Sequence, residues 1–126
     1  MDITAFWNDT LKQNRPRLAA YFCTEAVIRW QCTNEQFPVE EFIRVNCDYP
    51  GEWDGEIERI ELHEDSIITA VRVFLTDRSA SFHVVSFFTL QDDKIATLDE
   101  YWADDGDAPE WRKAMGLGHR LKRSTI

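Results

Sequence analysis

The sequence predicts an α+β fold in which N-terminal helices pack on a curved antiparallel sheet. Two features indicate this class. Apolar residues recur at helical spacing near the N-terminus, whereas from Glu56 onward they alternate with a period of two. The alternating runs are separated by short polar turns, which can join only antiparallel strands because a parallel connection needs a dozen or more residues. We therefore expect helices first and a meander of strands after them.

The first half of the chain is expected to hold three helices and one strand. The N-terminal helix carries apolar residues at helical spacing and can be capped by Asp2 or Thr4. Pro16 interrupts this helix, and Pro38 opens the third helix, which has two acids in its first turn. After the N-terminal helix we expect a short second helix over residues 17–21, a strand over 26–30 and the third helix over 39–47.

Four strands are expected in the second half, over residues 56–63, 67–75, 81–90 and 95–102. The third of these, SFHVVSFFTL, is apolar on both faces, with Phe82, Val84 and Phe88 on one and Val85 and Phe87 on the other. A half-exposed strand would carry polar residues at every second position. The helices can cover one face, so a second subunit packed sheet to sheet should cover the other. A monomer whose C-terminal tail covers this face is the alternative.

Length and charge restrict the classes of function. With 126 residues, 44% of them hydrophobic, the chain is expected to form one domain over residues 1–126. The net charge of −9 argues against a nucleic-acid partner, which needs a basic surface, and disfavours an anionic membrane. No run approaches the ~20 apolar residues that span a bilayer. Residues 111–126 contain five Lys or Arg and no acid, and this basic tail is expected to fold back on the acidic body.

The cysteines and the missing motifs argue against a cofactor or a metal. Cys23, Cys32 and Cys47 are odd in number and lack metal-binding spacing, and no apolar signal segment follows Met1. A reduced, cytoplasmic protein is therefore expected, with each cysteine acting as a small hydrophobe. The sequence contains no phosphate-binding glycine loop, zinc set or nucleophile elbow. The acids of residues 104–107 are more typical of a solvated turn than of a calcium site.

The end of the last expected strand carries a resemblance to a known family. Asp93-Lys94-Ile95, Tyr101-Trp102 and Pro109-Glu110-Trp111-Arg112 resemble the end of a nuclear transport factor 2-like domain, in particular its SnoaL-like, polyketide cyclase-type branch. The order helix, helix, strand, helix, meander also fits, so the resemblance covers nearly the whole chain as one SnoaL-like domain.

This resemblance implies a cystatin-like, cone-shaped half-barrel. Its concave sheet and helices would enclose a pocket, and its convex sheet face would make a homodimer. The superfamily includes isomerases, cyclases, dehydratases and non-catalytic binding domains, so the fold alone selects no activity.

The register of the last two strands decides which side chains share the pocket. A two-residue turn at Asp92-Asp93 would place His83, Glu100 and Trp102 on one face and Ser86, Asp99 and Tyr101 on the other. In the superfamily the last strand often turns its Trp inward, so the first of these faces is expected to line the pocket. A bulge would change this division. The expected lining is Trp7, Trp30, Trp53, Val85, Leu98 and Trp102.

Glu100 and His83 are the candidate catalytic residues. An apolar pocket would raise the pKa of the Glu100 carboxyl toward neutrality, and His83 could share its proton. A salt bridge from Glu100 to Arg29 or to the basic tail, and a structural hydrogen-bonded His83, are the alternatives. The two carboxylates of ketosteroid isomerase fall approximately at Trp30 and at Val85 or Ser86, none of which is an acid, so its route is not expected here.

Two functions follow as hypotheses. The first is metal-free acid–base catalysis of an isomerase, cyclase or dehydratase step on a small hydrophobic molecule. The second is a non-catalytic ligand-binding or dimeric assembly module that uses the same cavity. Convergence of Glu100 and His83 on open pocket volume would favour catalysis.

Overall fold

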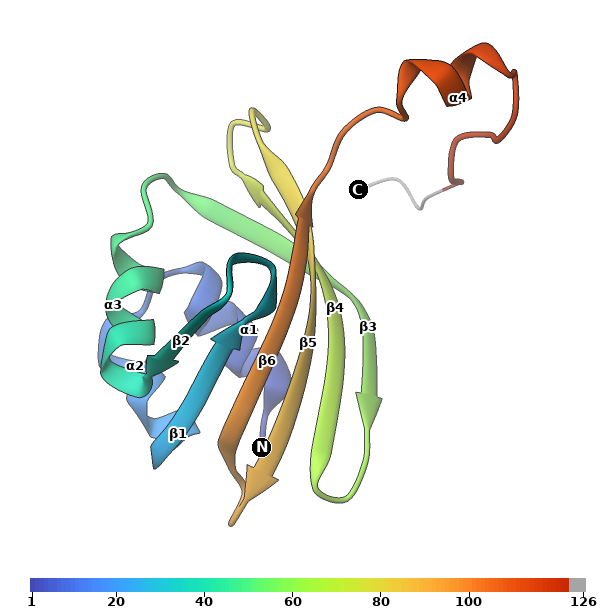
Figure 1. Cartoon of the computed structure of the whole chain (residues 1–126). Helices are drawn as coiled ribbons and strands as arrows, with labels where there is room; N and C mark the ends of the chain where they lie inside the picture. Colours follow the sequence, from blue (N-terminus) through green and yellow to red (C-terminus); the bar gives the residue numbers. More distant parts are fainter. Residues whose placement is uncertain (123–126) are drawn as a thin grey trace.

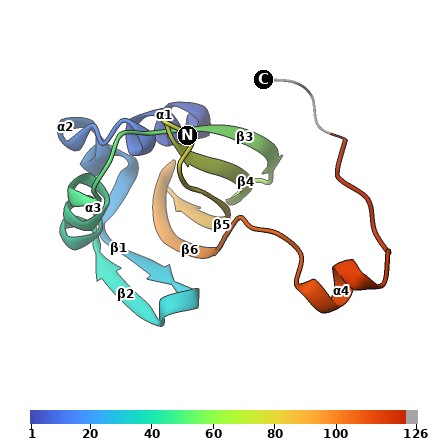
Figure 2. The ribbon, with the colours of Figure 1, turned by 90° about the horizontal axis from the view of Figure 1, so that it is seen from above.

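The computed structural model describes residues 1–122, and its α+β architecture confirms the predicted class (Figure 1). Six strands form one curved sheet, and the helices of the first half pack on its concave side (Figure 2). The helices are α1 (Ile3–Leu11), α2 (Arg15–Leu18), α3 (Val39–Asp48) and α4 (Glu110–Ala114). The strands are β1 (Phe22–Trp30), β2 (Glu35–Pro38), β3 (Trp53–Leu62), β4 (Ser66–Leu75), β5 (Ser81–Gln91) and β6 (Lys94–Asp104).

Local side chains account for the boundaries of the first helices. Asp2 caps α1, and its carboxylate accepts a hydrogen bond of 2.9 Å from the backbone amide of Ala5. Pro16 lies in the first turn of α2, where the backbone amide that proline lacks would have no partner within the helix. Two acids occupy the first turn of α3, as predicted, where their negative charge interacts favourably with the positive end of the helix dipole.

The sheet has the strand order β2-β1-β6-β5-β4-β3. β1 and β6 run parallel, and the other neighbouring pairs are antiparallel. The parallel pair differs from a wholly antiparallel sheet, and the long connection between β1 and β6 is what permits it. The edge strand β2 was also not predicted, because its four residues EQFP lack an alternating pattern and end in a proline.

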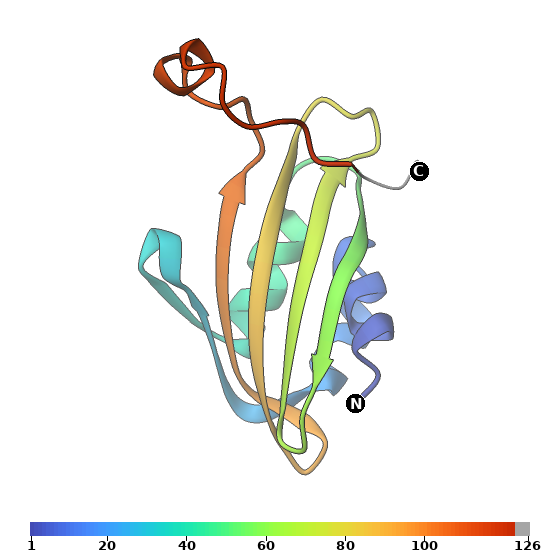
Figure 3. The ribbon, with the colours of Figure 1, turned by 90° about the vertical axis from the view of Figure 1, so that its right-hand side faces the viewer.

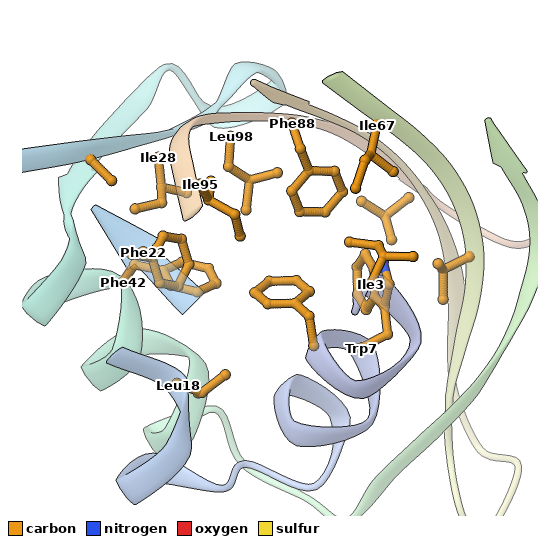
Figure 4. Close-up of a cluster of buried hydrophobic side chains, with 14 of the residues drawn as sticks. Ile3, Trp7, Leu18, Phe22, Ile28, Phe42, Ile67, Phe88, Ile95 and Leu98 are labelled. Atoms are coloured by element: carbon orange, nitrogen blue, oxygen red, sulfur yellow. The ribbon is translucent and has the colours of Figure 1, made fainter. Parts of the chain in front are cut away.

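The core lies between the concave face of the sheet and the helices α1 to α3 (Figure 4). The ring of Phe6, on α1, is at its centre, with edge-to-face contacts to four other aromatic rings at centroid distances of 5.4 to 5.9 Å. Gly55 lets α1 approach β3 closely. A Cβ atom there would lie 2.7 Å from the backbone oxygen of Arg72 and 3.1 Å from the Leu11 side chain.

A β-bulge in β6 changes the register of the last hairpin. Gln91 pairs with Lys94 as predicted, but the pairing shifts between Thr89 and Leu90, and Ala96 has no partner on β5. Ile95 and Leu98 are three residues apart, so a regular strand would point them to opposite faces. The bulge lets both point into the core, where both are fully buried (Figure 4).

The bulge corrects the predicted division of side chains between the two faces. The predicted pairs His83–Trp102 and Val85–Glu100 are wrong, because beyond the bulge each residue of β5 pairs with the residue of β6 one position later in the sequence than expected. Val84 and Ser86 lie opposite Trp102 and Glu100 on the concave face. His83 and Val85 lie on the convex face, which Figure 3 shows with the helices behind it.

The C-terminal segment leaves the sheet after β6 and extends away from it (Figure 1, Figure 2). Residues 111–122 are all exposed, so the prediction that the tail folds back on the body is wrong for them; residues 123–126 of the tail lie outside the described part. α4 has only five residues, and its ion pair, between Lys113 and Glu110 at 3.3 Å, is internal to the helix. Within residues 1–122, no helix has the length and apolar character needed to cross a membrane.

Candidate functional site

A cavity of about 310 Å³ lies between the concave face of the sheet and the helices α1 and α3. This volume is at the lower end of the range of small-molecule sites. Tryptophans from four elements lie on its wall: Trp7 from α1, Trp30 from β1, Trp53 from β3 and Trp102 from β6. Its exposed lining residues, which mark the opening, are Thr33, Glu35, Tyr49 and Asp104.

One side of the cavity is a continuous row of aromatic rings, which we call the aromatic row: Tyr49, Trp53, Phe82 and Trp102. Successive ring centroids along it are 5.2, 5.8 and 6.4 Å apart, and successive rings are inclined by 82°, 66° and 58°. These are favourable aromatic contacts, so the rings hold one another in place. Because each ring is inclined to the next, the faces of successive rings in the row point in different directions.

Glu100 is the one buried carboxyl among the lining residues of the described chain, with 7% of its surface exposed. It lies directly opposite Trp30 on β1 and Ser86 on β5. The Ser86 hydroxyl donates a hydrogen bond of 2.6 Å to Oε2, and the Trp30 indole Nε1 donates one of 3.2 Å to Oε1. The carboxyl is thus held by two uncharged donors from the neighbouring strands.

Burial raises the pKa of the Glu100 carboxyl above its usual range, and the hydrogen bonds from Ser86 and Trp30 oppose this shift. No Lys, Arg or His of residues 1–122 lines the cavity, so no cation there offsets the effect of burial. A carboxylate has about four acceptor positions, of which two are occupied here. Each oxygen thus accepts one hydrogen bond from the described residues and keeps about one further acceptor position.

Next to Glu100 and Ser86, the neighbouring strand β4 adds a further polar residue to the concave face. Thr69 on β4 lies opposite Ser86, and its hydroxyl accepts a hydrogen bond of 3.1 Å from the Trp7 indole Nε1. Both Thr69 and Ser86 are fully buried. These contacts satisfy polar groups that would otherwise be costly inside an apolar cavity.

The structure does not bring His83 and Glu100 together. The Nδ1 atom of His83 lies 2.5 Å from Asp105 Oδ1, and its Nε2 atom lies 3.2 Å from Glu58 Oε1, on the convex face. Neither alternative ion pair of Glu100 is present among the described residues. Arg29 instead binds the carboxylate of Asp99 through two hydrogen bonds of 2.7 and 3.0 Å.

The remaining expected lining residues divide between the two faces. Val85 is 38% exposed on the convex face, because the bulge in β6 places it opposite Tyr101 and not opposite Glu100. Leu98 is on the concave side but is fully buried in the core rather than on the cavity wall. Sequence reasoning missed Ser86 as the partner of Glu100. Its polar side chain inside the apolar run of β5 was the available signal.

Comparisons with known proteins report on the fold. No protein-family model and no curated protein matches the sequence. A proposed ketosteroid isomerase from Kribbella flavida DSM 17836 superposes with a TM-score of 0.76 and 20% identity, over 95% of this chain and 87% of the other. An NTF-2 like protein of unknown function from Burkholderia xenovorans LB400 does so with a TM-score of 0.76 and 16% identity, over 95% and 92%.

A third solved structure is named for the SnoaL-like branch, which the end of the sequence resembles. A proposed SnoaL-like polyketide cyclase from Shewanella putrefaciens CN-32 superposes with a TM-score of 0.64 and 8% identity, over 76% of this chain and 73% of the other. Such low identities carry the fold and not the activity. The chain has the nuclear transport factor 2-like fold that these ketosteroid isomerase-like and SnoaL-like proteins share.

Proposed function

We propose that the cavity binds a small apolar molecule and that Glu100 exchanges a proton with it, in a metal-free step of the isomerase, cyclase or dehydratase type. The observation that carries this proposal is the buried Glu100 carboxyl on the wall of an aromatic cavity, with acceptor positions left open. A carboxyl whose pKa lies closer to neutrality can act as both acid and base near physiological pH. Solved structures of the same fold that are named for an isomerase and a cyclase are consistent with such chemistry.

The absence of His83 from the cavity restricts the mechanism. Glu100 would take a proton from a carbon atom of the ligand and return it to a second atom on the same side of the molecule. The broken C–H bond leaves its electron pair on the ligand, and the new bond forms from the proton held on Glu100. Ser86 and Trp30 would stabilise the carboxylate before the transfer, because both donate to its oxygens. A 1,3-proton shift fits this single group best.

Binding without chemistry is the second candidate. Within residues 1–122, the other ionisable lining residues, Glu35, Tyr49 and Asp104, are all exposed at the opening, so the cavity holds no buried acid–base pair. A ligand-binding module needs only the aromatic walls and a hydrogen-bonding group, both of which are present.

We also propose a homodimer formed through the convex face of the sheet. Val85, Phe87 and Tyr101 are 38%, 42% and 47% exposed there. The rings of Phe87 and Tyr101 pack edge to face, with 6.0 Å between their centroids. Contiguous apolar surface on a sheet is typical of an interaction site, and a second copy would present the same patch by two-fold symmetry. The free state of Cys23, Cys32 and Cys47 supports a reducing, cytoplasmic location for this dimer.

Exchange of deuterium from D₂O into a panel of cyclic ketones tests the catalytic proposal. We expect deuterium incorporation next to the carbonyl, detected by NMR, for ketones that fit the cavity, and its loss in Glu100→Gln. Native mass spectrometry of the same preparations reports bound ligand and the dimer. Ligand binding without any Glu100-dependent exchange would support the binding module and overturn the enzyme.

A further inference from the structure

The ionisable side chains that line the cavity are of one sign. Three carboxyls contribute to it: Glu100 inside, and Glu35 and Asp104 at the opening. Among the lining residues within 1–122, none is Lys, Arg or His. A lining whose charged side chains are all acidic attracts a cationic ligand and repels an anionic one.

We propose that the ligand of this cavity carries a positive charge, as a tertiary or quaternary ammonium group attached to an apolar skeleton. The inference rests on the proposed binding function of the cavity and names the ligand class that this function would select.

The aromatic row supplies the second half of such a site. A cation within about 6 Å of a ring centroid is attracted by the negative face of the ring, most strongly by tryptophan. Trp53 and Trp102 lie on opposite sides of Phe82 in the row, and Trp30 approaches from β1 with its Nε1 on Glu100. Inclined rings can therefore contact an ammonium group from more than one direction. The apolar substituents of the ammonium nitrogen would at the same time pack against the apolar wall of the cavity.

The nearby basic side chains are engaged elsewhere, so they do not neutralise the opening. Arg15 and Arg44 both approach Asp48, at 3.0 and 3.7 Å, and Lys12 lies 3.7 Å from Asp54. Glu35 and Asp104 make no hydrogen bond or ion pair with the side chains of residues 1–122. The whole chain is also strongly acidic, with a net charge of −9, which raises the local concentration of cations near a cleft of the same sign.

Cation binding should be coupled to the protonation of Glu100. An ammonium group in the cavity favours the ionised carboxylate, so binding releases a proton and becomes tighter as the pH rises. The other titratable groups of the lining are Glu35 from β2, Asp104 from the end of β6 and Tyr49 after α3; α1 contributes none. Because Glu100 is the buried acid of this lining, the pH dependence of cation binding is assigned to it.

An isosteric pair of probes separates charge from shape. Phenyltrimethylammonium and tert-butylbenzene differ in replacing nitrogen by carbon, and 4-tert-butylbenzoate adds an anion of similar size. Binding to the full chain would be measured by calorimetry between about pH 5.5 and 8.5. We expect the ammonium compound to bind about tenfold or more tightly than tert-butylbenzene at the upper pH, with only the ammonium affinity rising with pH. We expect the benzoate to bind more weakly than both.

Variants locate the effect. Glu100→Gln should remove the pH dependence and most of the preference for the cation, while the affinity for tert-butylbenzene stays within about twofold. Asp104→Asn at the opening should weaken ammonium binding about twofold to threefold. Because this variant keeps Glu100, it still tests the inference if Glu100→Gln fails to fold. Asp107→Asn removes the same charge from an exposed residue that does not line the cavity and should change nothing.

The outcomes separate the two proposals. Equal affinity for phenyltrimethylammonium and tert-butylbenzene would overturn the cationic ligand and leave the apolar binding site standing. Failure of all three probes to bind would overturn the binding function and the inference with it. A preference for the cation that survives in Glu100→Gln and Asp104→Asn alike would also contradict the inference.

Discussion

The two faces of the sheet place neighbouring acids in opposite surroundings. Asp99 and Glu100 follow one another on β6, and each lies directly opposite a residue of β1: Arg29 for Asp99 and Trp30 for Glu100. On the convex face, hydrogen bonds from the Arg29 guanidinium hold the pKa of Asp99 below its usual range. On the concave face, burial raises the pKa of Glu100. One step along the strand thus separates a structural ion pair from a carboxyl suited to proton exchange.

The bulge at Ala96 decides which acid has which role. Without it, the residues of β6 beyond it would be displaced by one position relative to β5, and Asp99 rather than Glu100 would lie opposite Ser86. The residue that sets the site is therefore four positions from Glu100 and far from the cavity opening. The proposed function of the concave face and the proposed interface on the convex face both depend on it.

Glu100→Gln should give the largest effect. The amide keeps the shape of the side chain but cannot exchange a proton in the same way, so we expect deuterium exchange into a bound ketone to fall about 10²- to 10⁴-fold. Exchange followed by NMR in D₂O checks this, with thermal unfolding as the test of folding. Asp107→Asn is the control for a lost surface charge, and unchanged exchange in Glu100→Gln would contradict the role given to this residue.

Phe87→Asp tests the convex face. A charge in the centre of the proposed sheet-to-sheet contact would be left without a partner, so the dissociation constant of the proposed dimer should rise about 30-fold or more. Analytical ultracentrifugation over a range of concentrations measures it. Leu62→Asp is the matched control, because Leu62 is also exposed but pairs with Ile67 outside the convex patch. Equal effects of the two variants would argue against this interface.

Asp99→Asn should have a smaller effect, on stability. It removes the ion pair with Arg29, a partly exposed pair, so the free energy of unfolding at neutral pH should fall by about 1 kcal/mol. The lowered pKa of Asp99 stabilises the fold above the ordinary value of this group, and this contribution is lost as the pH falls through the lowered value. The difference between the wild-type chain and the variant, measured by urea unfolding, should therefore shrink in acid.

Glu100→Gln should show the opposite dependence on pH. The raised pKa means that the folded chain keeps a proton that the unfolded chain releases, so the wild-type chain loses stability as the pH rises from about 4.5 to the raised value. The glutamine variant lacks this loss. Its stability relative to the wild-type chain should therefore increase with pH over that interval, and a flat difference would contradict the assigned environment.

Much of the fold could be predicted because it follows from local patterns. The helix α3 was predicted over 39–47 and observed over Val39–Asp48, and the four long strands were found within a few residues of their observed ends. The tryptophans on the cavity wall could be predicted because large aromatic side chains are usually buried on the inner side of such elements.

The features that were missed depend on tertiary context. β2 is defined by its pairing with β1 and by little in its own residues. The bulge left one local signal, the spacing of three between Ile95 and Leu98, which a regular strand cannot bury on one face. Since the side of every later residue on β6 depends on it, one unrecognised bulge was enough to place His83 on the same face as Glu100 and to miss Ser86 as the residue opposite Glu100.

Titration of the side-chain carboxyls by ¹³C NMR tests the central claim most directly. Uniformly labelled protein would be followed from about pH 2.5 to 9, with Glu100 and Asp99 assigned by comparison with Glu100→Gln and Asp99→Asn. We predict that Glu100 titrates above the ordinary value for glutamate and Asp99 below the ordinary value for aspartate. A Glu100 that titrates at or below its ordinary value would show that the concave face does not hold a buried, proton-exchanging carboxyl, and would contradict the proposed function.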